Sequence, residues 1–197
     1  MGSTRLEAFS DAVIAIIITI MVLELRAPHD PGLEALVPLL PVFGSYVLSF
    51  IYLGIYWNNH HHMFQVTERV DGSVLWANLH LLFWLSVVPF TTAWMGENHF
   101  AATPTAVYGV TLLMAAIAYY ILQGRIIRLE GQDSTLARAV GRDWKGKVSP
   151  ILYLLAIPLA FVHVLISQLI YLIAAIIWLV PDKRIEQAVP AKASPRA

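Results

Sequence analysis

The chain has 197 residues, of which 58% are hydrophobic and 13% charged, and its mean hydropathy of +0.66 exceeds that of ordinary soluble domains. This composition predicts an integral membrane protein. The formal net charge is zero and there is no cysteine, which excludes disulfides, thiolate chemistry and cysteine-based metal sites.

Four apolar runs are long enough to cross a bilayer, which takes about 20 residues. They lie at about 6–25, 41–64, 74–95 and 104–122. A fifth region, residues 148–180, holds 33 residues without a formal charge, and as one helix it would be about 50 Å long. Because the hydrocarbon core is about 30 Å thick, we expect two short spans there, 148–164 and 166–180. The polar residues His163, Ser167 and Gln168 mark the expected reversal.

The sequence therefore predicts an all-α protein, an integral membrane six-helix bundle forming one domain over residues 1–181, with a disordered cytoplasmic tail at 182–197. With six spans, only Arg26 lies on one side of the membrane. The basic residues of the other side are Arg5, Arg69, Arg125, Arg128, Arg138, Arg142, Lys145, Lys147, Lys183, Arg184, Lys192 and Arg196. By the positive-inside rule we expect a multi-pass protein of the cell (plasma) membrane with both termini in the cytoplasm.

The first predicted helix has two different faces. Thr4 and Glu7 form a capping-box pattern at its start. At 100° per residue, one stripe contains Arg5, Phe9, Ala12, Ile16, Thr19, Ile20 and Leu23. Ser10 and Asp11 lie off this stripe, with Asp11 about 140° from Ile16. Periodicity alone favours packing of the stripe against a neighbouring helix. Since no span offers the convergent polar groups of a substrate cavity, any pore would be shared between subunits.

Asp11 needs partners inside the protein, because an aspartate within the membrane costs about 2.5 to 3.5 kcal/mol on insertion scales. The second and third predicted helices supply candidates at similar depth, which are Trp57, His60, His61, Asn78 and His80. Two interpretations are open: a structural network that ties the three helices together, or a proton path, since a histidine beside a carboxylate titrates near neutral pH. Residues 60–62 are consecutive histidines that do not share a helix face, so we predict no structural metal site there.

The connection at 125–147 carries Leu136, Val140 and Trp144 at four-residue spacing, with Arg138 and Arg142 between them. A short interfacial helix facing anionic membrane lipid and an ordinary solvated loop both fit this pattern.

The stretch RLEAFSD at 5–11 has the form R-x-x-x-F-S-D and resembles the motif that opens the first helix in the transmembrane protein 175 family of potassium channels. WNNHHHMF at 57–64 and NLHLLFWLSVVPF at 78–90 support the resemblance, which extends over nearly the whole chain. The resemblance implies a homotetramer in which each subunit contributes one six-helix repeat and the first helices line a central pore. The candidate site then comprises the family motif together with the interhelical network expected around Asp11: Arg5, Phe9, Ser10, Asp11, Trp57, His60, His61 and Asn78.

The resemblance further implies roles along the stripe. Ile16 would form the main constriction, Thr19 a layer of hydroxyls that helps to discriminate cations, and Ile20 and Leu23 the outward continuation, with permeant potassium at the Ile16 and Thr19 layers. Four isoleucines would make an apolar ring that gates by dewetting. VYGVT at 107–111 differs from a carbonyl filter motif. At the outer mouth, Glu24 would either concentrate cations or form an interfacial ion pair of little consequence with Arg26.

The predicted function is a cation channel with modest selectivity for potassium over sodium, giving a passive potassium leak. A proton-permeable channel is the nearest alternative, and a secondary transporter is a further one. We predict no enzymatic activity, because no nucleophile or metal set converges at one depth. The expected partners are other copies of the chain, potassium and similar monovalent cations, and membrane lipid, with no cofactor and no nucleic acid.

Overall fold

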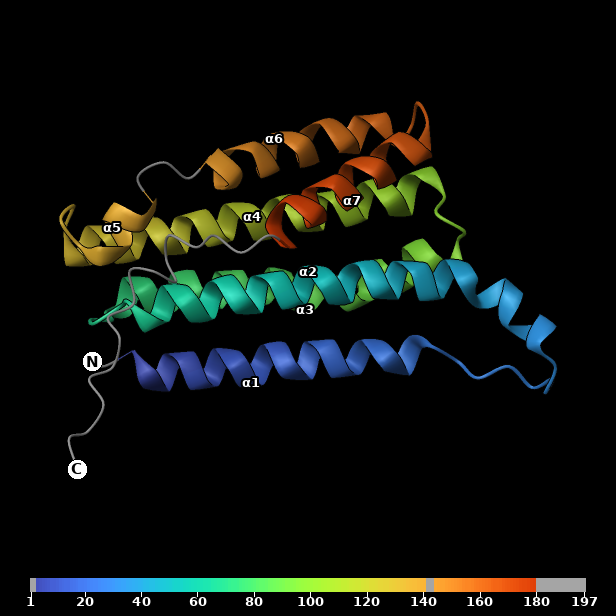
Figure 1. The fold of residues 1–197 in the computed structure, drawn as a ribbon, viewed down its shortest axis with the longest axis horizontal. Helices are drawn as coiled ribbons and strands as arrows, with labels where there is room; N and C mark the ends of the chain where they lie inside the picture. The colour runs from blue at the N-terminus through green and yellow to red at the C-terminus, as the bar shows by residue number, and fades with distance from the viewer. Residues whose placement is uncertain (1–2, 141–143, 180–197) are drawn as a thin grey trace.

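The computed structural model describes residues 3–140 and 144–179, and every regular element within them is helical (Figure 1). The helices are α1 (Thr4–Met21), α2 (Leu40–Gln65), α3 (Gly72–Glu97), α4 (Ala102–Glu130), α5 (Thr135–Val140), α6 (Trp144–Leu159) and α7 (Val164–Leu179). Two 3-10 segments, η1 (Val22–Glu24) and η2 (Leu33–Leu39), lie between α1 and α2. The all-α prediction is confirmed. The predicted tail at 182–197 lies outside the described residues.

Four stretches are long and apolar enough to cross a membrane: Thr4–Glu24, Leu33–Gln65, Gly72–Glu97 and Ala102–Glu130. α6 and α7 have 16 residues each, which makes each about 24 Å long at about 1.5 Å per residue. The four long stretches by themselves indicate a multi-pass membrane protein. α4 continues well past residue 122, where its hydrophobic run ends, and reaches Glu130.

The reversal in the long uncharged region includes His163, one of the three polar residues expected to mark it, but it ends before Ser167 and Gln168. α6 ends at Leu159 and α7 begins at Val164, so residues 160–163 form the turn. Ser167 is instead buried inside α7, where its hydroxyl donates to the Ala156 carbonyl of α6 at 2.7 Å. A serine whose hydroxyl is satisfied across a helix pair needs no solvent, and its polarity therefore does not mark a turn.

The start of α1 also differs from the sequence expectation. Thr4 is the first residue of the helix, and Ser3 at the N-cap makes no side-chain capping bond, so the predicted capping box does not form. α3 has a true cap, because Asp71 Oδ1 accepts from the Val74 N–H at 2.9 Å and from the Ser73 hydroxyl at 2.8 Å. These bonds stabilise the carboxylate and hold the pKa of Asp71 below its usual range.

Buried hydroxyls connect helices in the core. Tyr108 on α4 and Ser49 on α2 are hydrogen-bonded at 3.0 Å, and the Tyr52 hydroxyl of α2 donates to the Tyr171 carbonyl of α7 at 2.6 Å. Gly109 gives α7 room to approach α4, since a Cβ there would overlap the Tyr171 hydroxyl and lie 3.1 Å from Ile157. Tyr108 and Gly109 of VYGVT are therefore packing residues.

α1 lies at one edge of the bundle, packed on α2 and α3, with α6 at the opposite edge (Figure 1). The connection after α4 contains the short helix α5, whose Leu136 side chain is buried.

Basic residues in the described part gather at the end where α1 begins: Arg5 in the first turn of α1, Arg69 between α2 and α3, and Arg125, Arg128 and Arg138 in the last turns of α4 and in α5. Arg142 and the basic residues of the tail lie outside the described residues.

Candidate functional site

The two faces of α1 differ sharply in burial. Its buried residues are Leu6, Ser10, Ile14, Ile17 and Met21. All members of the predicted stripe are exposed: Arg5, Phe9, Ala12, Ile16, Thr19, Ile20 and Leu23. Ile16 is 56% exposed and Leu23 74%. The stripe is therefore not the packing face of α1 within one chain, and an apolar surface of this kind faces either lipid or another subunit.

An open groove runs between α1 and α3 beside this stripe. Ile16 and Ile20 line it, and at the end where α1 stops it is lined by Glu24, Arg26 and Glu97. Among the described residues no ion pair joins Glu24 to Arg26. Sequence reasoning missed Glu97, although α3 follows the returning helix α2 and so runs parallel to α1, which brings the last residue of α3 level with Glu24.

A buried hydrogen-bonded chain joins α2, α3 and α1. His60 Nε2 and Asn78 Oδ1 are 2.8 Å apart, Asn78 Nδ2 donates to Ser10 Oγ at 2.9 Å, and the Ser10 hydroxyl donates to the Leu6 carbonyl at 2.9 Å. All three side chains are fully buried. Because Asn78 Oδ1 only accepts, His60 Nε2 must carry the proton, and every bond in the chain then points toward α1. If the Asn78 side-chain amide were flipped, its oxygen would face Ser10, and the Ser10 hydroxyl would have to donate to it. Ser10 would then lose its hydrogen bond to the Leu6 carbonyl.

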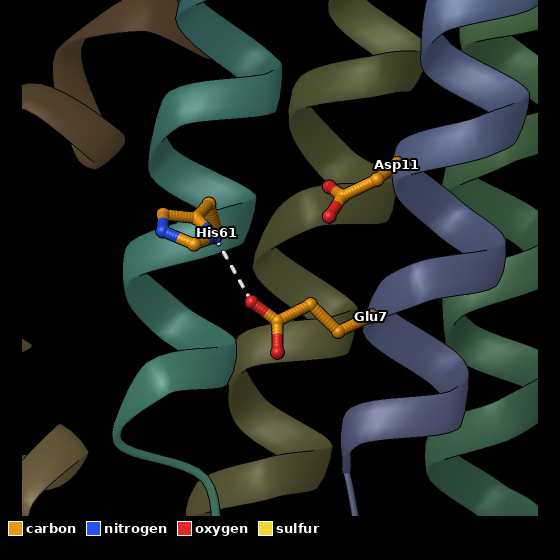
Figure 2. A group of neighbouring side chains, drawn as sticks. All are labelled: Glu7, Asp11 and His61. Atoms are coloured by element: carbon orange, nitrogen blue, oxygen red, sulfur yellow. Dashed lines mark ion pairs between the residues drawn. The ribbon is translucent and has the colours of Figure 1, made fainter.

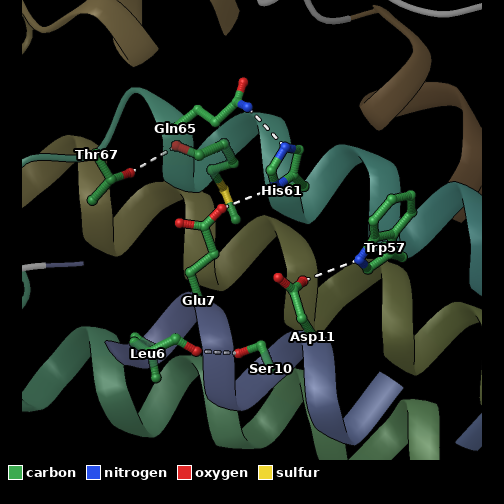
Figure 3. Close-up of polar contacts among 9 residues, drawn as sticks. Leu6, Glu7, Ser10, Asp11, Trp57, His61, Gln65 and Thr67 are labelled. Carbon is green, nitrogen blue, oxygen red and sulfur yellow. Dashed lines mark hydrogen bonds and ion pairs between the residues drawn. The ribbon is translucent and has the colours of Figure 1, made fainter. Parts of the chain in front are cut away.

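A second group of contacts joins α1 to α2 on a different face (Figure 3). Trp57 Nε1 donates to Asp11 Oδ1 at 3.1 Å, and His61 Nδ1 lies 2.9 Å from Glu7 Oε1. Gln65 Nε2 and His61 Nε2 are 2.7 Å apart. The side chains that the sequence grouped into one layer around Asp11 therefore form two separate sets. Asp11 contacts Trp57, whereas His60 and Asn78 serve Ser10.

His80 belongs to neither set, because it accepts a hydrogen bond from Trp84 Nε1 within α3 at 3.0 Å. Glu7 is the site residue that sequence reasoning missed. The capping-box pattern assigned Glu7 a role in capping the start of the helix. However, Glu7 and Asp11 are four residues apart and therefore share a helix face. Figure 2 shows both carboxylates on the side of α1 that faces His61.

The R-x-x-x-F-S-D motif thus divides between two surfaces. Arg5 and Phe9 are exposed on the stripe side, and Ser10 and Asp11 bond to α3 and α2. In the described structure no hydrogen bond connects the Asp11 set to the His60 chain, and His60 Nδ1 is buried without a partner. This geometry favours a role in fixing the orientation of α1 over a continuous proton path.

Known proteins match the region that contains these side chains, and some of them match nearly the whole chain. The family model described as endosomal/lysosomal potassium channel TMEM175 matches residues 5–89, which contain α1, α2 and most of α3. A Chryseobacterium sp. (strain P1-3) protein named as a potassium channel is 55% identical, over 95% of this chain and 98% of its own length. The crystal structure of a lysosomal potassium-selective channel TMEM175 homolog from Chamaesiphon minutus matches with a TM-score of 0.78 and 30% identity, over 91% of this chain and 97% of that one. A Danio rerio protein named endosomal/lysosomal proton channel TMEM175 is 30% identical over 66% of this chain, which spans 25% of that protein.

Proposed function

This chain belongs to the TMEM175 family of potassium channels, and we infer that it is a membrane channel through which potassium passes down its gradient. The family consists of ion channels, so the protein is not an enzyme. The finer proposals below concern how subunits assemble, which side chains meet the ion and how the chain lies in the membrane.

We propose a homotetramer in which the exposed stripe of α1 lines a central pore. One observation carries this proposal: α1 is attached to α2 and α3 by its buried and polar face, and its opposite face is a continuous, mostly apolar stripe that is exposed in the single chain. In a pore shared between subunits, this exposed stripe would face the stripes of the other copies. Four copies around an axis would put four Ile16 side chains at one level.

Ile16 is proposed as the constriction and Thr19 as the cation layer next to it. A ring of isoleucine side chains excludes water when narrow, and ions then cross only if the ring is wide enough to keep part of their hydration. The Thr19 hydroxyl donates to the Ile16 carbonyl within its own helix at 2.9 Å. Its proton is therefore engaged, and the exposed oxygen keeps a lone pair for a cation. Ile20 and Leu23 extend the narrow region toward Glu24.

We propose that the chain lies in the cell membrane with the start of α1 on the cytoplasmic side. The described arginines concentrate at that end of the bundle, and Arg26 lies near the other end. The positive-inside rule assigns the arginine-rich end to the cytoplasm. On this orientation, Glu24 and Glu97 lie at the outer mouth, where two carboxylates per subunit would raise the local cation concentration.

Planar-bilayer recording of the purified protein tests the proposal. Single-channel currents in potassium are expected, and replacing Ile16 by Asn should wet the ring and raise conductance or reduce selectivity. Ile173→Asn is the matched control, because Ile173 is 50% exposed on α7, away from α1. A silent wild-type protein, or equal effects of the two substitutions, would contradict the assignment of Ile16 to the pore.

Proton permeation is the second candidate, favoured by the relative named as a proton channel and by Glu7 and Asp11 beside His61. Reversal potentials measured in opposed pH and potassium gradients separate the two. A reversal potential that follows potassium supports the first candidate, and one that follows protons supports the second.

A further inference from the structure

Three side chains with metal-binding atoms converge between α1 and α2. Glu7, Asp11 and His61 each offer one ligand atom, and these atoms all lie within 4.8 Å of one another (Figure 2). Two come from α1 at a spacing of four residues, which places both carboxylates on one helix face. The third comes from α2, so an ion held by all three would bridge the two helices.

The charges at this position are unbalanced. Two carboxylates face one imidazole, and in the described structure no lysine or arginine pairs with either of them. Like charges four residues apart on a helix repel each other. A bound divalent cation would neutralise both carboxylates, which the neutral form of His61 does not.

The environment of His61 also favours a ligand. Its Nδ1 atom is shielded from solvent and makes no hydrogen bond, although it lies 2.9 Å from Glu7 Oε1. Its Nε2 atom faces the Gln65 side chain at 2.7 Å. If the Gln65 amide turns so that its oxygen accepts from the Nε2 proton, Nδ1 presents its lone pair to a metal, which is the usual outer-shell arrangement for a ligating histidine.

Asp11 is held in a similar way. Its Oδ1 atom accepts from Trp57 Nε1, and the Trp57 ring stacks on His61 with centroids 5.9 Å apart and planes 14° apart (Figure 3). In the part of the chain that is described, Oδ2 of Asp11 makes no hydrogen bond and remains available. Two of the three ligand side chains thus have contacts that orient them before any ion binds.

The donor set points to a particular class of ion. One imidazole nitrogen with two carboxylate oxygens suits zinc and similar transition metals, whereas calcium and magnesium prefer oxygen ligands alone. Zinc bonds of about 2.0 to 2.2 Å place tetrahedral ligand atoms about 3.4 Å apart. The present separations need only side-chain adjustments to close around an ion, with water as the fourth ligand.

We propose that Glu7, Asp11 and His61 form a zinc-class divalent cation site that joins α1 to α2. The inference goes beyond channel activity and does not depend on it, because binding is measured on the purified protein whether or not it conducts. Only one of the three consecutive histidines takes part, and the other two ligands come from the motif helix.

Equilibrium dialysis or titration calorimetry with zinc chloride, after removal of metal by a chelator, tests the site. The wild-type protein is expected to bind one zinc ion per chain. His61→Ala and Glu7→Gln should each weaken binding by more than about tenfold. His29→Ala, in the exposed α1–α2 connection, and His62→Ala are the matched histidine controls and should bind as the wild type does. No saturable zinc uptake by the wild type, or undiminished uptake by His61→Ala, would overturn the proposal.

Two further measurements guard against a variant that fails to fold. Zinc should raise the thermal midpoint of the wild-type protein by mass action, and the rise should be absent in Glu7→Gln, which keeps the shape of the side chain. A large excess of calcium should leave zinc binding unchanged. If calcium displaces the zinc, the histidine is not a ligand and the proposed site is wrong.

Discussion

Asn78 on α3 donates a hydrogen bond to Ser10 on α1 at 2.9 Å, in a region where neither side chain reaches solvent. This bond lies in the middle of a chain that begins at His60 on α2 and ends at a carbonyl of α1. Three helices are therefore held by one amide group, which supplies both an acceptor and a donor.

Replacing Asn78 by Ala should destabilise the subunit by about 1–3 kcal/mol, which is the cost of leaving a buried polar group unsatisfied. Both ring nitrogens of His60 would then lack partners, because its Nδ1 atom already has none. This cost exceeds the average of about 0.6 kcal/mol for a hydrogen bond between membrane helices. Denaturant unfolding in detergent, followed by tryptophan fluorescence, measures it.

Asn98→Ala is the control for Asn78→Ala. Asn98 is exposed at the C-cap of α3, and its side chain donates to the Trp94 carbonyl in the last turn of that helix. Equal losses of stability in the two variants would show that burial of the Asn78 bonds carries no special weight.

Asp11→Ala should reduce the fraction of intact oligomers before it changes ion selectivity. The substitution removes the acceptor of Trp57 Nε1 and releases α1 from α2, while Ile16 and Thr19 lie on another face. Asp11→Asn keeps an acceptor oxygen for Trp57 and should have the milder effect. Oligomer mass by light scattering and reversal potentials of the intact fraction provide the two readouts. A shifted permeability ratio in intact oligomers of the Ala variant would place Asp11 at the pore.

Asp71→Ala should lower the thermal midpoint near neutral pH, and the difference from wild type should vanish in acid. The folded-state pKa of Asp71 is depressed by its bonds to Val74 and Ser73, so the carboxylate stabilises the fold above its unfolded pKa of about 3.9. That contribution is lost as the pH falls through the lower, folded-state pKa. Thermal melts of both proteins across a pH series make the comparison.

Asp71→Ser supplies the uncharged control, because serine also caps helices but does not titrate. Its stability relative to Asp71→Ala should not depend on pH. If the difference in thermal midpoint between wild type and Asp71→Ala stays constant into strong acid, the charge of the Asp71 carboxylate does not stabilise the fold.

Gly109→Ala should destabilise α4 packing by about 1–3 kcal/mol, the usual cost of overfilling a tight contact. The added methyl group would meet the Tyr171 hydroxyl and Ile157. Gly124 lies on the same helix, and a Cβ added there would meet nothing within 4 Å, so Gly124→Ala is the matched control. It should be neutral or stabilising by up to about 1 kcal/mol, because alanine favours a helix. Unfolding titrations of both variants decide whether the two glycines differ as the packing indicates.

The two faces of α1 were predictable because helical periodicity alone separates Ser10 from Ile16. The division of the polar layer into two sets was not predictable from the sequence. The position of a residue along its helix gives its depth in the membrane, but it does not determine which neighbouring helix its side chain contacts. Asn78 and Trp57 lie at similar depth yet serve different partners. Glu7 was misassigned because a local capping pattern and a tertiary contact with His61 compete for the same carboxylate, and only packing decides between them.

The turn between α6 and α7 shows the same limit. Ser167 has the polarity of a turn residue, but its hydroxyl is satisfied by the Ala156 carbonyl across the helix pair. Residues 160–163, which do turn, are mostly apolar. In a bilayer, a polar side chain marks a place where partners converge, and this need not be a place where the chain reverses.

The polar contacts of α1 with other helices are confined to Glu7, Ser10 and Asp11 in the described structure. From Ala12 to Met21 the helix is held by apolar packing, which is not directional. Directional contacts therefore fix α1 at its first three turns, and contacts without directional preference hold the rest. A small twist of the outer portion would rotate Ile16 without breaking a side-chain hydrogen bond to a neighbouring helix. The angular position of Ile16 is then set by how Ile14, Ile17 and Met21, which are buried on the opposite face, pack against the neighbouring helices.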